Sequence, residues 1–88
     1  MNFKFKPGTF YLIKHDKLAA EVTFTVNEKI ISINHTLVDK SLRGQGIARK
    51  LMLQIISYAQ ENNYLINPVC SYSVKFFEHT DKYNDLLV

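Results

Sequence analysis

The sequence has very few of the residues that build disulfides, metal centres or membrane spans. It contains a single cysteine, Cys70, so no disulfide can form within the chain, and no Cys/His spacing of a zinc site is present. We therefore predict no bound metal. No window approaches the roughly 18 apolar residues of a transmembrane helix. Residues 1–7 lack the apolar core of a signal peptide, so the expected location is the cytoplasm, with no membrane partner.

Dense runs of one charge are also missing. The net charge is +3 with a sequence pI near 9.1, and the basic residues are spread along the chain. This balance does not favour nucleic acid as a partner, but it suits a small polyanionic ligand. With 88 residues, of which 47% are hydrophobic, the chain is expected to form one globular domain over residues 1–88, as a monomer or weak dimer.

Three segments in the first half have the pattern of β-strands. Thr9–Ile13 is rich in aromatic and β-branched residues, and residues 20–26 alternate between apolar and polar side chains. Ile30–Val38 is the third predicted strand. Short polar connections predict that the three form an antiparallel meander. Alternation along the third strand puts four residues on one face: Ile31, Ile33, His35 and Leu37.

A helical period replaces this alternation after Gly46. Apolar residues then recur every three or four positions through Ala59, which predicts an amphipathic helix ending near residues 62–63. The short apolar run Leu65–Val69 is predicted as a strand, and its Pro68 indicates either an edge strand or a strand that parts from its neighbour there. A second short helix is predicted over Ser71–His79.

The predicted fold class is α/β (α+β), with a mixed sheet. An antiparallel meander is followed by a strand–helix–strand crossover and a C-terminal helix. The crossover is long enough for parallel strands and should be right-handed. Ligands of such sheets bind at the carboxyl ends of the parallel strands, which are Leu37-Val38 and Val69-Cys70.

Two of the three glycines lie in the turn that opens the first helix, Arg43-Gly44-Gln45-Gly46-Ile47-Ala48. Free backbone N–H groups and the helix dipole make such a turn a candidate phosphate site. The turn is not a Walker loop, since no Gly-Lys-Ser/Thr follows, and Arg49 stands where a third glycine of the dinucleotide fingerprint would be. Spacing alone leaves two alternatives open, a pyrophosphate site and an ordinary loop leading into a helix.

Three segments together resemble the GNAT superfamily of acetyltransferases, in particular its short single-domain branch. They are His35-Thr36 on the third strand, the turn at residues 42–48, and Pro68-Val69-Cys70-Ser71-Tyr72 after the helix. The resemblance implies a minimal N-acetyltransferase that uses acetyl-CoA (coenzyme A) as a small-molecule acyl donor for an unidentified amine. It also implies a set of cofactor-binding residues: Leu37, Val38, Arg43, Gly44, Gln45, Gly46, Ile47, Ala48, Arg49 and Cys70.

His35 and Cys70 are the candidate catalytic residues. A neutral imidazole near the substrate can accept the proton of an amine, although a lone histidine on an apolar face can equally be a core residue. Cys70 precedes a predicted helix, whose N-terminus favours a thiolate, although an isolated cysteine is commonly buried and inert. Direct transfer to the amine and an acetyl-cysteine intermediate both stay open, with direct transfer favoured because proximity supplies much of the rate.

One departure from the family pattern concerns the general acid. Many larger members carry a tyrosine in the helix after the last of these strands, whereas this chain has Phe76-Phe77, with Tyr72 nearby. A non-catalytic module that binds CoA or acetyl-CoA is therefore the alternative function. A plain interaction domain, in which the glycine turn is only a turn, is the third possibility.

Overall fold

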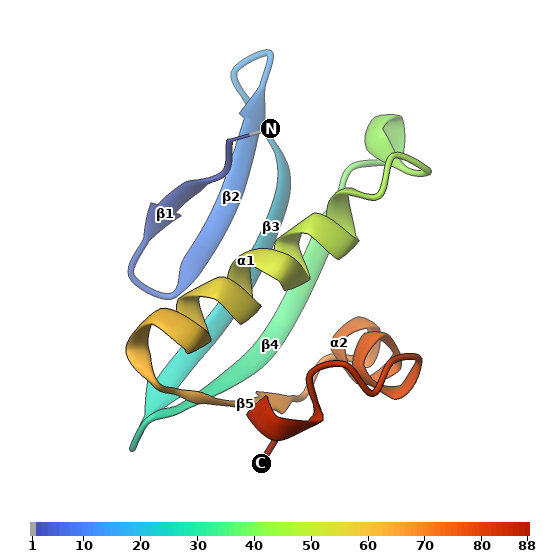
Figure 1. Cartoon of the computed structure of the whole chain (residues 1–88). Coiled ribbons are helices and arrows are strands. Elements are labelled where there is room, and N and C mark those ends of the chain that lie inside the picture. The colour runs from blue at the N-terminus through green and yellow to red at the C-terminus, as the bar shows by residue number, and fades with distance from the viewer. Residues whose placement is uncertain (1) are drawn as a thin grey trace.

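Five strands form one mixed sheet whose spatial order follows the sequence (Figure 1). The computed structural model describes residues 2–88. Strands β1 to β4 pair antiparallel, and β5 pairs parallel with β4, which confirms the predicted mixed sheet. The elements in chain order are β1 (Lys4–Lys6), β2 (Thr9–Lys14), β3 (Lys17–Asn27), β4 (Ile30–Val38), α1 (Ile47–Asn62), β5 (Leu65–Pro68) and α2 (Ser71–Glu78). Short 3₁₀ turns lie at Lys40–Leu42 and Asn84–Leu86.

The first strand, β1, is absent from the sequence prediction. Its three residues, Lys-Phe-Lys, offer one apolar side chain, which is too little for an alternating pattern. Phe5 pairs with Phe10 of β2, and the two rings lie 5.1 Å apart. Tertiary contact with the neighbouring strand therefore decides the conformation of this segment.

A β-bulge in β4 reverses the side-chain alternation and corrects one prediction. Thr23 pairs with His35, but the next residue of β3, Phe24, pairs with Ile33, so Asn34 is an extra residue in β4. The expected single face of Ile31, Ile33, His35 and Leu37 is therefore wrong. Ile31 and Ile33 are fully buried, whereas Leu37 is 41% exposed and His35 is also exposed. Beyond the bulge, Thr36 and Val38 continue the inward face.

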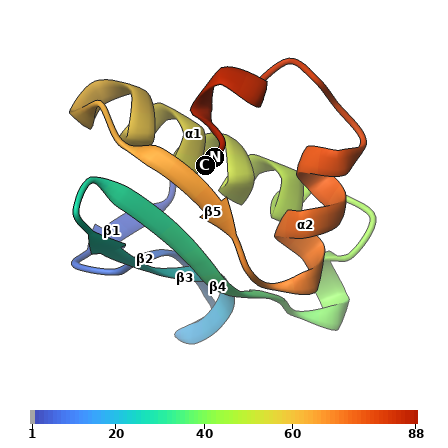
Figure 2. The ribbon, with the colours of Figure 1, turned by 90° about the horizontal axis from the view of Figure 1, so that it is seen from below.

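Both helices lie on the same side of the sheet (Figure 2). The predicted apolar stripe of α1 is buried against Phe24 and the inward residues of β4. Helix α2 buries Ser73 and Phe77. The sheet face that carries His35 has no helix over it in the part of the chain that the structure describes. No helix among residues 2–88 is long and apolar enough to cross a membrane.

Strands β4 and β5 part halfway along β4. Their pairing covers Ile30–Ile33 and Leu65–Pro68, and the last contacts are the N–H groups of Val69 and Cys70, which both donate to the Ile33 carbonyl (3.1 and 2.9 Å). Both predicted alternatives for Pro68 hold, since β5 is an edge strand and its pairing with β4 ends there. Because β5 turns into α2, the second half of β4 has a free edge on that side.

Candidate functional site

The turn before α1 is fixed to the sheet and the core. The Asp39 N–H donates to Ala19 of β3 (2.8 Å), and its carboxylate accepts hydrogen bonds from the N–H and hydroxyl of Ser41. These hydrogen bonds from Ser41 hold the pKa of Asp39 below its ordinary value. Leu42 is buried. The glycine turn that follows therefore starts from a defined position above the end of β4.

Within residues 2–88, the first N–H groups of α1 have no protein acceptor. Gly46 is the N-cap residue and has no side chain to accept them, and the first backbone bond runs from Lys50 N–H to the Gly46 carbonyl (3.1 Å). The first turn has no acidic residue but contains Arg49 and Lys50. Cations are unfavourable at the positive end of the helix dipole. This helix start therefore favours an external anion.

Glycine is favoured at positions 44 and 46 by the backbone conformation and not by tight packing. Their φ values are +83° and +72°, in the left-handed region that glycine adopts most easily. A Cβ built on either glycine would meet no atom within 4 Å. The space beside both glycines is open.

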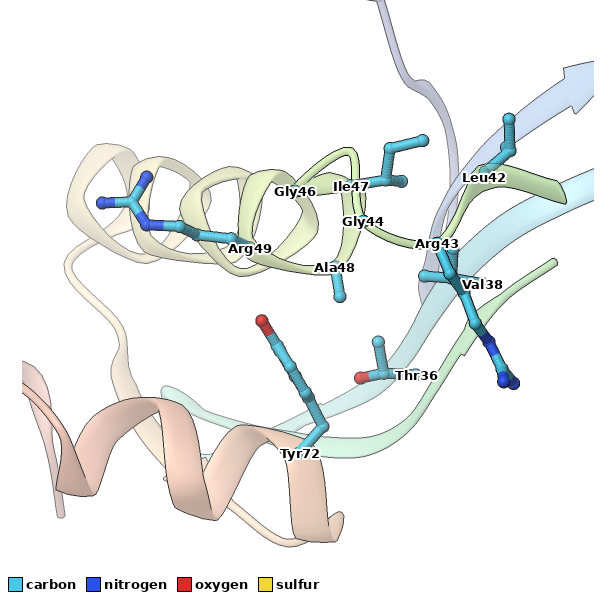
Figure 3. Close-up of a pocket in the computed structure, with 10 residues that line it drawn as sticks. All are labelled: Thr36, Val38, Leu42, Arg43, Gly44, Gly46, Ile47, Ala48, Arg49 and Tyr72. Atoms are coloured by element: carbon cyan, nitrogen blue, oxygen red, sulfur yellow. The ribbon is translucent and has the colours of Figure 1, made fainter. Parts of the chain in front are cut away.

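A cavity of about 350 Å³ lies between this helix start, the free edge of β4 and α2 (Figure 3). Seven of the ten predicted cofactor-binding residues line it: Val38, Arg43, Gly44, Gly46, Ile47, Ala48 and Arg49. Leu42, Thr36 and Tyr72 complete its wall. Gln45 is exposed outside the lining, and Leu37 faces the opposite side of the sheet because of the bulge.

Cys70 lies behind Thr36, next to the cavity but outside its lining. Its Sγ is 3.4 Å from Thr36 Oγ1 and 3.3 Å from Ser73 Oγ, while the Ser73 hydroxyl donates to the Cys70 carbonyl (2.8 Å). Burial acts most strongly on the pKa of the Cys70 thiol and raises it. The Ser73 and Thr36 hydroxyls and the N–H groups of Ser73 and Tyr72 together outweigh burial, so the pKa lies below its ordinary value. The Cys70 thiol therefore loses its proton more readily than the thiol of an isolated cysteine.

Alkylation of Cys70 by iodoacetamide should report this lowered pKa. Because the thiolate is the reactive form, the rate midpoint is expected at lower pH than for an unperturbed cysteine. Ser73→Ala removes a hydrogen-bond partner of the thiolate and should move the midpoint to higher pH. Ser71→Ala, a matched change at an exposed position of the same helix, should leave it in place. A midpoint that is insensitive to Ser73→Ala would contradict this explanation of the pKa.

Tyr72 is the cavity residue that sequence reasoning did not place. It follows Cys70 by two positions, and the first turn of α2 directs its hydroxyl toward α1 (Figure 3). Burial raises the pKa of Tyr72, against a smaller opposing effect of the Arg49 charge. The tyrosine is therefore protonated at neutral pH, with its O–H available inside the cavity. The place of the Tyr72 side chain depends on how α2 packs, and the hydrophobic pattern of the sequence does not predict that packing.

His35 is separated from Cys70 by the sheet. The bulge turns the imidazole to the open face, opposite Thr23, whereas Cys70 contacts Thr36 on the helix side. The two candidate catalytic residues therefore do not form a pair. Among residues 2–88 no group of three or more His, Cys, Asp or Glu side chains could hold a metal ion.

Solved structures that match this fold include N-acetyltransferases and a candidate for that activity. A GCN5-like candidate N-acetyltransferase from Staphylococcus aureus, solved by NMR, is 32% identical, with a TM-score of 0.82 over 99% of this chain and 87% of that one. The ribosomal-protein-S18-alanine N-acetyltransferase of Escherichia coli is 18% identical (TM-score 0.66), over 81% of this chain and 49% of that one. Tetrahymena GCN5 is 13% identical (TM-score 0.66), over 81% and 48%. No match was found among curated proteins.

These likenesses show that the chain has the acetyltransferase fold. It spans about half the length of the two larger enzymes. The family model described as GCN5-related N-acetyl-transferase matches residues 9–86. The chain belongs to the GCN5-related N-acetyltransferase family, whose members use acetyl-CoA as a cosubstrate. The family and fold of the sequence prediction are thereby confirmed.

Proposed function

We propose that the protein binds acetyl-CoA in the cavity at the start of α1 and transfers the acetyl group to a primary amine. The observation that carries this proposal is the uncapped, cation-flanked helix N-terminus, which opens onto a cavity where two parallel strands part. Backbone N–H groups of residues 44–49 would hold the pyrophosphate. Arg43 and Arg49 would add charge attraction.

The pantetheine arm would follow the free edge of β4. Because the Asp39 N–H points to β3, strand alternation turns the N–H groups of Thr36 and Val38 toward the side that β5 has left. The N–H of Val38 would then polarise the thioester carbonyl and stabilise the oxyanion that forms there. The same path leads past Leu37-Val38 to Cys70.

The acceptor would approach from the open face of the sheet. Its nitrogen attacks the thioester carbon, so that a C–N bond forms and the C–S bond breaks. His35, exposed on that face, would accept the proton of the amine, directly or through water. The departing CoA thiolate would take a proton from Tyr72 in the cavity. Cys70 would act beside the thioester, since the sheet separates it from the imidazole that an acetyl-cysteine route would use as base.

Replacement of His35 or Cys70 tests whether each side chain acts in the transfer step or only in binding the donor. His35→Ala and Cys70→Ala are each expected to lower turnover by about tenfold or more, with acetyl-CoA affinity changed by less than about threefold. Release of free CoA in the presence of a primary amine measures the first quantity, and calorimetry measures the second. His15→Ala, at the exposed β2–β3 turn, is the matched control. Unchanged turnover in both variants would remove His35 and Cys70 from the catalytic residues.

A donor-binding module without transfer is the second candidate function. It is favoured by the absence of any helix, within residues 2–88, over the sheet face from which an acceptor would come. An amide-shift NMR titration with acetyl-CoA and a panel of amines distinguishes the candidates. Saturable shifts at Val38, residues 43–50 and Cys70, with acetylated amine formed, are expected. Shifts without any product would favour the binding module, and no shifts at millimolar donor would exclude both.

A further inference from the structure

The open face of the sheet, opposite both helices, carries a carboxylate close to His35 (Figure 2). Glu21 lies between two fully buried residues of β3, so strand alternation directs its side chain to the open face. It pairs with Leu37 of β4, while Thr23, two positions further along β3, pairs with His35. Glu21 and His35 are therefore diagonal neighbours on adjacent strands, at a spacing of roughly 7–8 Å.

Apolar side chains lie beside Glu21 on this face. Leu37 is exposed, and so are Ile13 and Leu18, which pair with each other near the end of the β2–β3 hairpin. Both alternate with buried neighbours, which places them on the open face. Tyr11 pairs with Glu21 from the side of β2. This combination matches a lysine side chain, whose methylene stem can cover apolar surface while its ammonium reaches a carboxylate.

Two lysines of β1 lie on the same face, beyond Tyr11. Phe5 packs toward α1, with its ring centre 5.6 Å from that of Tyr58, so the residues on either side of it, Lys4 and Lys6, point away from the helix. Lys6 Nζ lies 5.2 Å from the centre of the Tyr11 ring. The open face therefore has a carboxylate near its centre and cations toward the β1 edge. Such an edge attracts acidic groups and repels a second amine.

The middle of the open face is not hollowed. Five cavities of about 210 to 550 Å³ lie along residues 2–88, and none of them is lined by Tyr11, Glu21, His35 or Leu37. Sites for small molecules are concave and bury most of the ligand. A face without a cavity gives a small amine few contacts, but it lets a protein surface approach with one side chain projecting from it.

We propose that the acetyl acceptor is a lysine side chain on a protein whose surface around that lysine is acidic. The ammonium would approach Glu21 and His35 with its stem on Leu37, and the acidic neighbours would face the β1 lysines. This inference rests on the proposed function and adds the class of acceptor to it.

The transfer step then follows the proposed chemistry. The lysine ammonium loses one proton to water, and His35 accepts a second proton as Nζ bonds to the thioester carbon. The C–S bond breaks, and the CoA thiolate takes a proton from the Tyr72 hydroxyl. Both side chains return to their starting protonation through solvent. Glu21 takes no part in the bond changes and is a specificity residue.

The acceptor class is tested with N-terminally blocked peptides that contain one lysine flanked by glutamates, glutamines or arginines, at saturating acetyl-CoA. At low ionic strength kcat/KM is expected to be about tenfold higher with glutamate than with glutamine flanks, and lowest with arginine flanks. Butylamine, which has the lysine stem without the flanks, should react no faster than the glutamine peptide. Added salt should reduce the preference for glutamate, because exposed charges are screened.

Charge reversal at the β1 edge tests the contacts with the flanks. Lys6→Glu should remove most of the preference for the glutamate peptide. Lys75→Glu makes the same change of net charge at an exposed position of α2, on the other side of the sheet, and should keep the preference. An amide spectrum of each variant checks the fold. A preference that survives Lys6→Glu in a folded protein would overturn the placement of the acidic flanks.

Glu21→Gln tests the contact with the lysine itself. Loss of the carboxylate should raise KM for the glutamine peptide by about fivefold, with kcat and acetyl-CoA affinity changed by less than about threefold. Glu61→Gln, at an exposed position of α1, is the matched control. Equal kcat/KM for the three peptides, or a higher value for butylamine, would overturn the acceptor assignment and leave the proposed function standing. Acetyl-CoA that binds but acetylates neither peptide nor butylamine would overturn the proposed transfer itself.

Discussion

Gly46→Asn is expected to lower the affinity for acetyl-CoA by about a hundredfold while the fold stays intact, which corresponds to about 2.7 kcal/mol. The side chain would fill the open space beside Gly46, where a phosphate must approach the N–H groups of Ile47 and Ala48. Loss of one hydrogen bond to a charged group, worth roughly 1.5–3 kcal/mol, already accounts for an effect of this size. Calorimetry with acetyl-CoA gives the affinity.

Asparagine is chosen because it tolerates the left-handed conformation better than other side chains. The chain itself gives the precedent, since Asn63 ends α1 with φ of 58° and ψ of 41°, close to the 72° and 21° of Gly46. The variant should therefore keep a native amide spectrum and a melting temperature within a few degrees of the wild type. Gln45→Asn, between the two glycines but outside the cavity lining, should bind acetyl-CoA normally. Wild-type affinity in a folded Gly46→Asn protein would exclude phosphate binding by these backbone groups.

The long elements were predictable because each contains several turns or alternations of a single period. Strand β4 was predicted with its observed bounds, and the predicted α1 stripe is buried against the sheet. The glycine turn was predictable because two glycines stand where a strand gives way to a helix. A local pattern is enough in these cases, since the side chains that decide the structure are neighbours in sequence.

The bulge at Asn34 was missed although the sequence carries a signal for it. Asn34, His35 and Thr36 are three consecutive polar residues that interrupt the alternation of residues 31–34, and the extra residue puts Thr36 and Val38 on the inward face. One shifted residue moved His35 from the expected inward face to the open face. The separation of His35 from Cys70 follows from this single residue and supports the direct transfer that proximity already favoured.

The second cavity, of about 270 Å³ beside α2, had no comparable signal. Arg49, Tyr72 and Lys82 are far apart in the chain and meet only because α2 packs beside α1 and the last residues return to the sheet. The Val88 N–H donates to Ile66 (3.0 Å), which ties the end of the chain to β5. Contacts of this kind depend on tertiary packing and cannot be predicted from the periodicity of the sequence.

Tyr72→Phe is expected to lower turnover by about a hundredfold, the lower part of the range for general acid catalysis. Because burial raises the pKa of Tyr72, the hydroxyl keeps its proton at neutral pH and can give it to the departing thiolate. A raised pKa also means that the protonated form persists to higher pH than in an ordinary tyrosine. Loss of wild-type activity below about pH 10, the ordinary tyrosine value, should therefore arise from other groups.

The variant distinguishes proton donation from a purely structural role. Phenylalanine keeps the ring in the cavity wall, so acetyl-CoA affinity should change by less than about threefold while turnover falls. Tyr58→Phe removes a hydroxyl that packs beside Phe10, outside the cavity that Tyr72 lines, and should leave turnover unchanged. Turnover of Tyr72→Phe at the wild-type level would mean that water protonates the thiolate. The chain would then catalyse transfer by bringing donor and acceptor together at the parted strands, with binding and orientation supplying the rate.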